Sequence, residues 1–160
     1  MESVEQVVNF LEKYQLSLTT AESCTAGLMA SMVAEVMGAG AVLESGFVVY
    51  SSQAKHASLG VSLQTMDTYG LTSEEVAREM AVGALKISRA DIVLANTGLA
   101  EADGDMCGVQ YFACAMSVNG HEGVVSETVK FEGGRNEVRA AAARYALLQL
   151  PYYYERLRLV

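Results

Sequence analysis

Hydrophobic and polar residues follow helical and extended periods along the chain, and these periods predict its elements. Near the N-terminus, Val4, Val8 and Leu11 recur at spacings of four and three with charged residues between them, which is typical of an amphipathic helix. Hydroxyl residues followed by acidic residues, as in Thr72-Ser73-Glu74-Glu75, mark another helix start. The predicted helices cover residues 3–15, 25–36, 51–59, 62–69, 72–89 and 135–150.

Short apolar runs between these helices predict strands. Residues 91–96 (DIVLAN) form an apolar strand of the kind found inside a parallel sheet. Asn119-Gly120 separates two further runs and is the strongest short signal for a hairpin turn. The predicted strands cover residues 17–21, 42–50, 91–96, 109–118 and 121–131, with a loop at 98–108. Helices that alternate with strands, plus one hairpin, predict an α/β fold: a three-layer α/β/α sandwich with a mixed, mostly parallel sheet.

Composition narrows this picture to one globular domain over residues 1–160. The chain has 160 residues, is 51% hydrophobic and contains one proline, so it can bury a sizeable core and is not disordered. Its net charge of −8 repels phosphate backbones and anionic lipid, so we expect no nucleic-acid or membrane partner. Three cysteines without a CxxC pair, and no signal-peptide pattern, indicate a reduced cytoplasmic protein without disulfides.

The first candidate for chemistry is the junction at residues 20–27. There a predicted strand turns directly into a predicted helix, and Ser23 lies at the turn. A serine in that place stands next to backbone N–H groups that can hold an oxyanion or a phosphate. The plain alternative is that Ser23 or Thr25 only caps the helix.

The second candidate lies at the end of the predicted strand 42–50. Open α/β sheets place ligands at such strand ends, and Tyr50 and Lys55 follow there. A serine becomes nucleophilic when a base takes its proton, and a buried neutral lysine can be that base. The alternative is that Tyr50 ends the strand and Lys55 is a solvated helix residue.

The third candidate is the start of the last predicted helix. Arg135 and Arg139 lie one helical turn apart and can grip an anion together, or they can pair with acidic residues such as Glu132. The sequence has no P-loop, GxGxxG or metal-ligand pattern, so we expect no cofactor and no metal.

Seven stretches together resemble the CinA C-terminal domain family, and they cover nearly the whole chain in order. The stretches are AESCTAG, SGFVVYSSQAK, YGLTSEEVAREMAVGAL, SRADI, TGLA, GVQYFA and FEGGRNEVR. Well-known members of that family are nicotinamide-nucleotide amidases, which deamidate nicotinamide mononucleotide during pyridine nucleotide recycling. The resemblance implies a three-layer α/β/α fold, a homodimer, a small-molecule nucleotide substrate and a serine nucleophile without a metal.

The resemblance also implies roles for particular residues. The nucleophile maps onto Ser23, and the tyrosine and lysine of the family motif map onto Tyr50 and Lys55. Ser23 is expected to attack the carboxamide, Lys55 to act as base, Tyr50 to assist the proton transfer, and backbone N–H groups after Ser23 to hold the oxyanion. Arg135 is the candidate for the substrate's phosphate. The remaining expected substrate-binding residues are Glu22, Cys24, Thr25, Gly27, Thr97 and Gly98.

Two places depart from the family pattern and keep other functions open. Ala26 stands where the family usually has glycine, and the loop after Gly98 carries Glu101, Asp103 and Asp105 in place of glycines and a proline. Negative charge in that loop opposes a phosphorylated substrate. The chain is therefore either the predicted amidase or an inactive or differently specific paralogue that binds a nucleotide or a partner. An amidase for an unphosphorylated or cationic amide is the third possibility.

Overall fold

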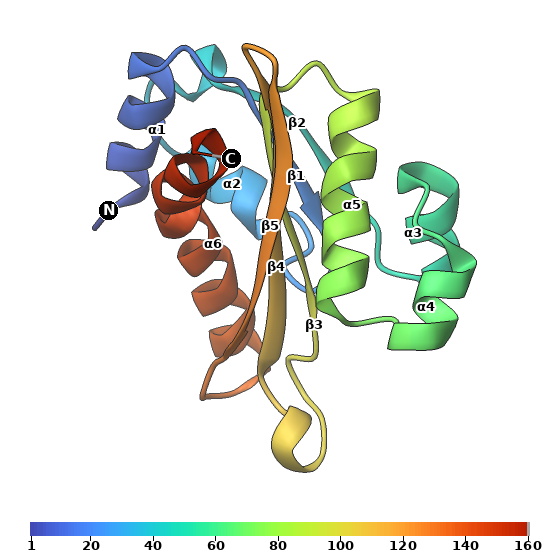
Figure 1. The fold of residues 1–160 in the computed structure, drawn as a ribbon. Helices are drawn as coiled ribbons and strands as arrows, with labels where there is room; N and C mark the ends of the chain where they lie inside the picture. Colours follow the sequence, from blue (N-terminus) through green and yellow to red (C-terminus); the bar gives the residue numbers. More distant parts are fainter. Residues whose placement is uncertain (160) are drawn as a thin grey trace.

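A five-stranded sheet runs through the middle of the molecule in the computed structural model, which describes residues 1–159 (Figure 1). In space the strands follow the order β2-β1-β3-β4-β5. β1 is parallel to both β2 and β3, whereas β4 is antiparallel to both β3 and β5, so every strand except β4 points the same way. The strands are β1 Leu18–Glu22, β2 Leu43–Val48, β3 Ile92–Gly98, β4 Val109–Val118 and β5 His121–Lys130.

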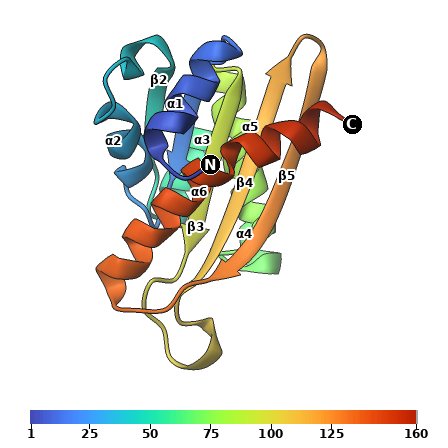
Figure 2. The same cartoon turned by 90° about the vertical axis from the view of Figure 1, so that its left-hand side faces the viewer.

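Helices cover both faces of this sheet (Figures 1 and 2). On one face lie α1 Val4–Lys13, α2 Leu28–Ala34 and α6 Arg135–Arg158, which Figure 2 shows in front of the strands. On the other lie α3 Ser52–Leu59, α4 Leu63–Tyr69 and α5 Glu74–Ile87. Two short 3₁₀ turns complete the order, η1 Ala39–Ala41 and η2 Gly104–Met106. The predicted α/β/α sandwich with a mixed sheet is confirmed.

The sheet divides the interior into two cores because successive strand residues face opposite sides. Along β3, Ile92 and Leu94 pack toward α1, α2 and α6, while Val93 and Ala95 pack toward α5. Within residues 1–159, no helix combines the length and the apolar character that crossing a bilayer requires.

Helix α6 is longer than the sequence predicted. It continues through Pro151 to Arg158, whereas the pattern predicted an end at residue 150. A proline inside a helix costs about 3 kcal/mol, because it removes one N–H donor and crowds the preceding turn. Beyond it, Tyr153 and Leu157 are almost completely buried against the sheet, and that burial offsets the cost.

Helix α2 is shorter than the sequence predicted, because it begins at Leu28 and not at residue 25. Residues 23–27 form a turn in which Ala26 and Gly27 adopt left-handed conformations, with φ of 46° and 98°. A left-handed residue cannot continue a right-handed helix, so the turn separates Ser23 from α2.

Candidate active site

The three parallel strands end at one edge of the sheet, and the segments that follow them enclose a cavity of about 160 Å³. Six of the predicted site residues line this cavity: Ser23, Cys24, Tyr50, Lys55, Gly98 and Arg135. The other four, Glu22, Thr25, Gly27 and Thr97, do not line it. The topology thus brings the turn after β1, the segment after β2 and the end of β3 together.

Ser23 and Lys55 form a buried pair in the lining of this cavity. The Lys55 Nζ atom lies 2.9 Å from Ser23 Oγ and 2.9 Å from the backbone oxygen of Tyr50. Lys55 is 1% exposed, and no ion pair of the described residues includes it. Burial lowers the pKa of Lys55 to about 8, because a desolvated ammonium group is costly. A fraction of Lys55 is therefore neutral near pH 7 and can accept a proton from Ser23.

The carboxylate of Glu22 organises the turn that carries Ser23. Glu22 is fully buried, and its two oxygens accept five hydrogen bonds. The donors are the hydroxyls of Thr20 and Thr25 and the backbone N–H groups of Gly27, Met29 and Ala30. Three of these donors belong to the N-terminal end of α2, where a negative charge is favourable. Glu22, Thr25 and Gly27 therefore shape the turn from behind the cavity.

The backbone N–H groups of the turn are almost all engaged. Ser23 N donates to the backbone oxygen of Asn96, Thr25 N donates to Asn96 Oδ1, and Ala26 N donates to Ser23 O. Among residues 1–159, the N–H of Cys24 has no such acceptor, and Cys24 lines the cavity. The N–H groups that were expected to hold an oxyanion are thus reduced to the one beside the nucleophile.

Asn96 and Gln110 support this turn, and the sequence analysis did not single them out. Both are fully buried, and Asn96 Nδ2 donates to Gln110 Oε1 at 3.0 Å. The signal that marks them is a polar residue inside a run of buried apolar strand residues. Gly98 is required beside them, because a Cβ atom there would lie 2.5 Å from the Gln110 amide carbon.

The thiol of Cys24 is an unsuitable nucleophile. Cys24 is 5% exposed, and burial raises the pKa of its thiol, so the reactive thiolate is disfavoured. The serine next to it, which has a lysine partner, is the better nucleophile.

Tyr50 and Arg135 meet at the mouth of the cavity. An Arg135 Nη2 hydrogen is donated to the Tyr50 hydroxyl at 3.0 Å, and the Tyr50 side chain is half exposed. The hydroxyl therefore lies with Arg135, while the backbone oxygen of Tyr50 holds Lys55. Arg139 does not line the cavity beside Arg135. Its guanidinium donates to the backbone oxygens of Cys24 and Thr25.

Of the three acidic loop residues, Glu101 lines the cavity, and Asp103 and Asp105 do not. Glu101 Oε2 lies 4.0 Å from Arg135 Nη1. Asp103 and Asp105 are exposed at the η2 turn, which extends beyond the end of the sheet (Figure 1). The loop therefore brings one carboxylate to the cavity. There it lies beside Arg135, the arginine among the described lining residues.

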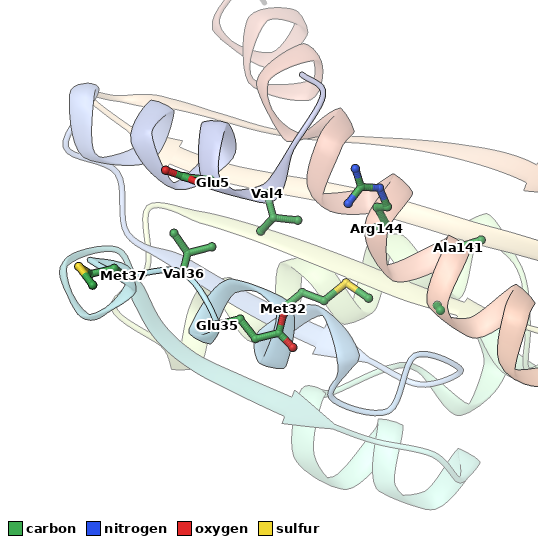
Figure 3. Close-up of a pocket in the computed structure, with 9 residues that line it drawn as sticks. Val4, Glu5, Met32, Glu35, Val36, Met37, Ala141 and Arg144 are labelled. Atoms are coloured by element: carbon green, nitrogen blue, oxygen red, sulfur yellow. The ribbon is translucent and has the colours of Figure 1, made fainter.

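A larger cavity of about 630 Å³ lies elsewhere, between α1, α2 and α6 (Figure 3). Apolar side chains such as Val4, Met32 and Val36 face it, and Arg144 lies at its edge. Its lining includes no hydroxyl, thiol or lysine amine. Of these two cavities, the smaller one at the strand ends is the one lined by a serine hydroxyl beside a lysine amine.

Comparisons with known proteins show which family the chain resembles. The family model of the CinA C-terminal domain matches residues 1–153. The chain is 40% identical over 154 residues to the nicotinamide-nucleotide amidohydrolase PncC of Escherichia coli strain K12, which covers 94% of this chain and 92% of that protein. It is also 41% identical over 151 residues to a CinA-like protein of Kosmotoga olearia. This match covers 91% of this chain and 36% of that longer protein.

Solved structures show the same fold. The competence/damage inducible protein CihA from Agrobacterium tumefaciens is similar with a TM-score of 0.86 and 34% identity, over 94% of this chain and 95% of that chain. A CinA superfamily protein from Escherichia coli is similar with a TM-score of 0.83 and 36% identity, over 93% of this chain and 89% of that chain.

Proposed function

This chain belongs to the CinA C-terminal domain family, and from that membership we propose that it hydrolyses the carboxamide of nicotinamide mononucleotide to nicotinic acid mononucleotide and ammonia. The relatives named nicotinamide-nucleotide amidohydrolase support the substrate class. The observation that carries the proposal is the buried contact of 2.9 Å between Ser23 Oγ and Lys55 Nζ, with a lysine whose pKa is lowered to about 8.

In the first half of the reaction, neutral Lys55 takes the proton of Ser23 as Oγ attacks the carboxamide carbon. The Cys24 N–H is the donor proposed for the developing oxyanion, because it follows Ser23 directly and has no acceptor among the described residues. Collapse of the tetrahedral intermediate breaks the C–N bond, and Lys55 returns the proton to the leaving ammonia. The product of this half is an acyl ester on Ser23.

In the second half, water attacks the ester carbonyl, and Lys55 again acts as the base. The acid leaves, and Ser23 regains its proton. The backbone oxygen of Tyr50 keeps Nζ in place throughout. The Tyr50 hydroxyl accepts a hydrogen bond from Arg135 at 3.0 Å in the free protein and keeps its own proton, so its assisting role is that of a donor.

The test is release of ammonia and nicotinic acid mononucleotide from nicotinamide mononucleotide by the purified protein. We expect Ser23→Ala to reduce kcat by about a thousandfold or more with an unchanged circular dichroism spectrum. Ser52→Ala is the matched control, because Ser52 is exposed on α3 and does not line the cavity. Turnover that survives in Ser23→Ala would remove the serine from the proposed role.

Glu101 favours a second candidate function, because its carboxylate lies beside the arginine that would hold a phosphate. In that case the chain binds a nucleotide without hydrolysing it, or it acts on an unphosphorylated amide. A thermal shift with nicotinamide mononucleotide distinguishes the first of these, because a ligand of the native state raises Tm. A higher Tm without ammonia release supports the function of binding the nucleotide without hydrolysing it.

We also propose that the protein is a homodimer, as the family resemblance implies. Light scattering behind size exclusion measures the mass directly, and a mass near 17.1 kDa contradicts the proposal.

We propose a cytoplasmic location. The support is the three free cysteines, Cys24, Cys107 and Cys114, because thiols persist in reducing compartments. Fractionation of cells that express the tagged chain tests this, and recovery outside the cytoplasmic fraction contradicts it.

A further inference from the structure

A carboxylate and an arginine from distant parts of the chain face one another at the mouth of the active-site cavity. Arg135 is the first residue of α6, and Glu101 follows β3 in the loop that departs from the family pattern. We propose that Glu101 determines substrate specificity by competing with the substrate's phosphate for Arg135. The inference rests on the proposed function, since it concerns which amide-bearing nucleoside or nucleotide the same site prefers.

Arg135 has the position and chemistry to bind a phosphate. Its guanidinium presents N–H donors in a planar fork that suits phosphate oxygens. One donor reaches the Tyr50 hydroxyl at 3.0 Å, and a second nitrogen lies 4.0 Å from Glu101 Oε2. The other cation that lines the cavity is Lys55, which is buried against Ser23. An anion that enters the cavity therefore meets Arg135 at the mouth.

The contact between Glu101 and Arg135 is weak enough for a ligand to displace. The distance of 4.0 Å is at the outer limit of an ion pair, and the side chains are 64% and 47% exposed. Exposed pairs of this kind contribute little free energy. A phosphate dianion with two N–H contacts can therefore replace the carboxylate on the guanidinium.

The displaced carboxylate stays in the vicinity of the cavity, because the backbone that leads to it is fixed. Its neighbour Ala100 is 5% exposed and packs with Cys24 and Val138. Leu99 next to it is bonded through both backbone groups, because its N–H donates to Val109 O and its oxygen accepts from Gly108 N. The backbone at residue 101 is thus held beside the cavity, and repulsion between two like charges remains after the phosphate binds.

The two halves of a nicotinamide nucleotide respond to this carboxylate in opposite ways. The pyridinium ring of the nucleotide is positively charged, and the phosphate is negatively charged. The corresponding nucleoside keeps the positive ring and lacks the phosphate. Glu101 therefore penalises the nucleotide and not the nucleoside, which shifts the preference of the site toward unphosphorylated pyridinium amides.

The experiment compares kcat and KM for nicotinamide mononucleotide and nicotinamide riboside in the natural chain, Glu101→Gln and Asp103→Asn. We expect Glu101→Gln to lower KM for the nucleotide about tenfold, leave kcat within about twofold, and give no improvement for the nucleoside. Asp103→Asn removes the same charge from an exposed position of the same loop. It should leave kcat and KM for both substrates unchanged. The difference between the variants should shrink as salt is added.

Binding separates a failure of this proposal from a failure of the proposed function. If the natural chain releases ammonia from neither compound, the amidase proposal fails, and calorimetry with ribose 5-phosphate then tests Glu101 alone. We expect Glu101→Gln to bind ribose 5-phosphate about tenfold more tightly than the natural chain does. A nucleotide-to-nucleoside ratio within twofold of the natural chain overturns the specificity proposal. Where there is no turnover, the specificity proposal is overturned if both proteins bind ribose 5-phosphate equally well, or if neither binds it detectably.

Discussion

At the scale of single residues, two buried charged side chains on the same edge of the sheet have contrasting surroundings. The Glu22 carboxylate accepts five hydrogen bonds and is thereby compensated within the protein. Within residues 1–159, the Lys55 amine has hydrogen-bond contacts only with a serine hydroxyl and a backbone oxygen, and its burial lowers its pKa to about 8. The first residue shapes the turn, and the second is available for proton transfer.

Activity should depend on pH through Lys55. Because the neutral amine is the form that accepts the proton of Ser23, kcat/KM should rise about tenfold per pH unit below pH 8 and level off above it. Initial rates of ammonia release between pH 6 and pH 9.5 measure this. A profile that is flat across that interval would mean that Lys55 is not the base.

Stability should depend on pH through the same residue. The pKa of Lys55 is lowered from 10.5 to about 8 in the folded chain, so between these values the unfolded chain holds the proton and the folded chain does not. Raising the pH through this window therefore stabilises the natural chain relative to Lys55→Met, by about 3 kcal/mol in total. Urea unfolding of both proteins at pH 7.5 and pH 10.5 measures the difference. A difference that stays constant contradicts the burial of a titrating amine.

Glu22→Gln should impair the turn without touching the cavity. The amide supplies one acceptor oxygen in place of two, and its NH₂ group then faces N–H donors of α2. We expect unfolding to become easier by about 2–4 kcal/mol, and kcat to fall at least about tenfold with little change in KM. Glu35→Gln, at an exposed position at the end of α2, is the control and should match the natural chain.

At the scale of elements, helix α6 links the active site to the rest of the core. Its first turns place Arg135 at the cavity mouth and Arg139 on the backbone of the Ser23 turn. Its last turns cover the sheet beyond Pro151, where the Tyr153 hydroxyl donates to Glu127 of β5. The helix therefore depends on tertiary packing where its own sequence favours a stop.

Replacing Pro151 with alanine should stabilise α6. Alanine restores an N–H that can donate to the oxygen of Leu147 and removes the crowding of the preceding turn, so we expect a gain of about 1–3 kcal/mol and a higher Tm. The site is unaffected, and kcat should not change. Calorimetry of Pro151→Ala measures the gain, and a lower Tm would show that the proline ring contributes packing that alanine cannot replace.

At the scale of the whole molecule, the sheet is shared by two cores. Both faces of β3 are buried, one under α6 and α2 and the other under α5, so neither layer of helices has a core without the sheet. The proposed catalytic pair joins two of these elements, because Ser23 follows β1 and Lys55 belongs to α3.

This sharing predicts one cooperative unfolding transition, as for a single domain of residues 1–160. The secondary structure followed by far-ultraviolet circular dichroism and the tyrosine packing followed in the near ultraviolet should unfold at the same temperature. Two separated midpoints would mean that one layer unfolds before the other.

The sequence by itself determined the elements and named the two central residues of the candidate site. Helical spacing, the Ser73 cap and the Asn119-Gly120 turn each act over a few neighbouring positions, so they are readable from the chain. Their places at predicted strand ends made Ser23 and Lys55 candidates, and the resemblance to a family joined them in one site. Local signals misjudged the ends of α2 and α6, because a left-handed turn and the burial of Tyr153 depend on contacts with other elements.

Only the tertiary structure decided which residues of the candidate site meet. Thr25 meets Asn96 across 71 positions, and Ser23 meets Lys55 across 32 positions. Such pairs depend on strand order and register, which no local pattern encodes. The burial that lowers the pKa of Lys55 likewise arises when several segments close over one side chain. The sequence therefore supplies the reactive side chains. The packing of the segments at the strand ends gives them their neighbours and their burial.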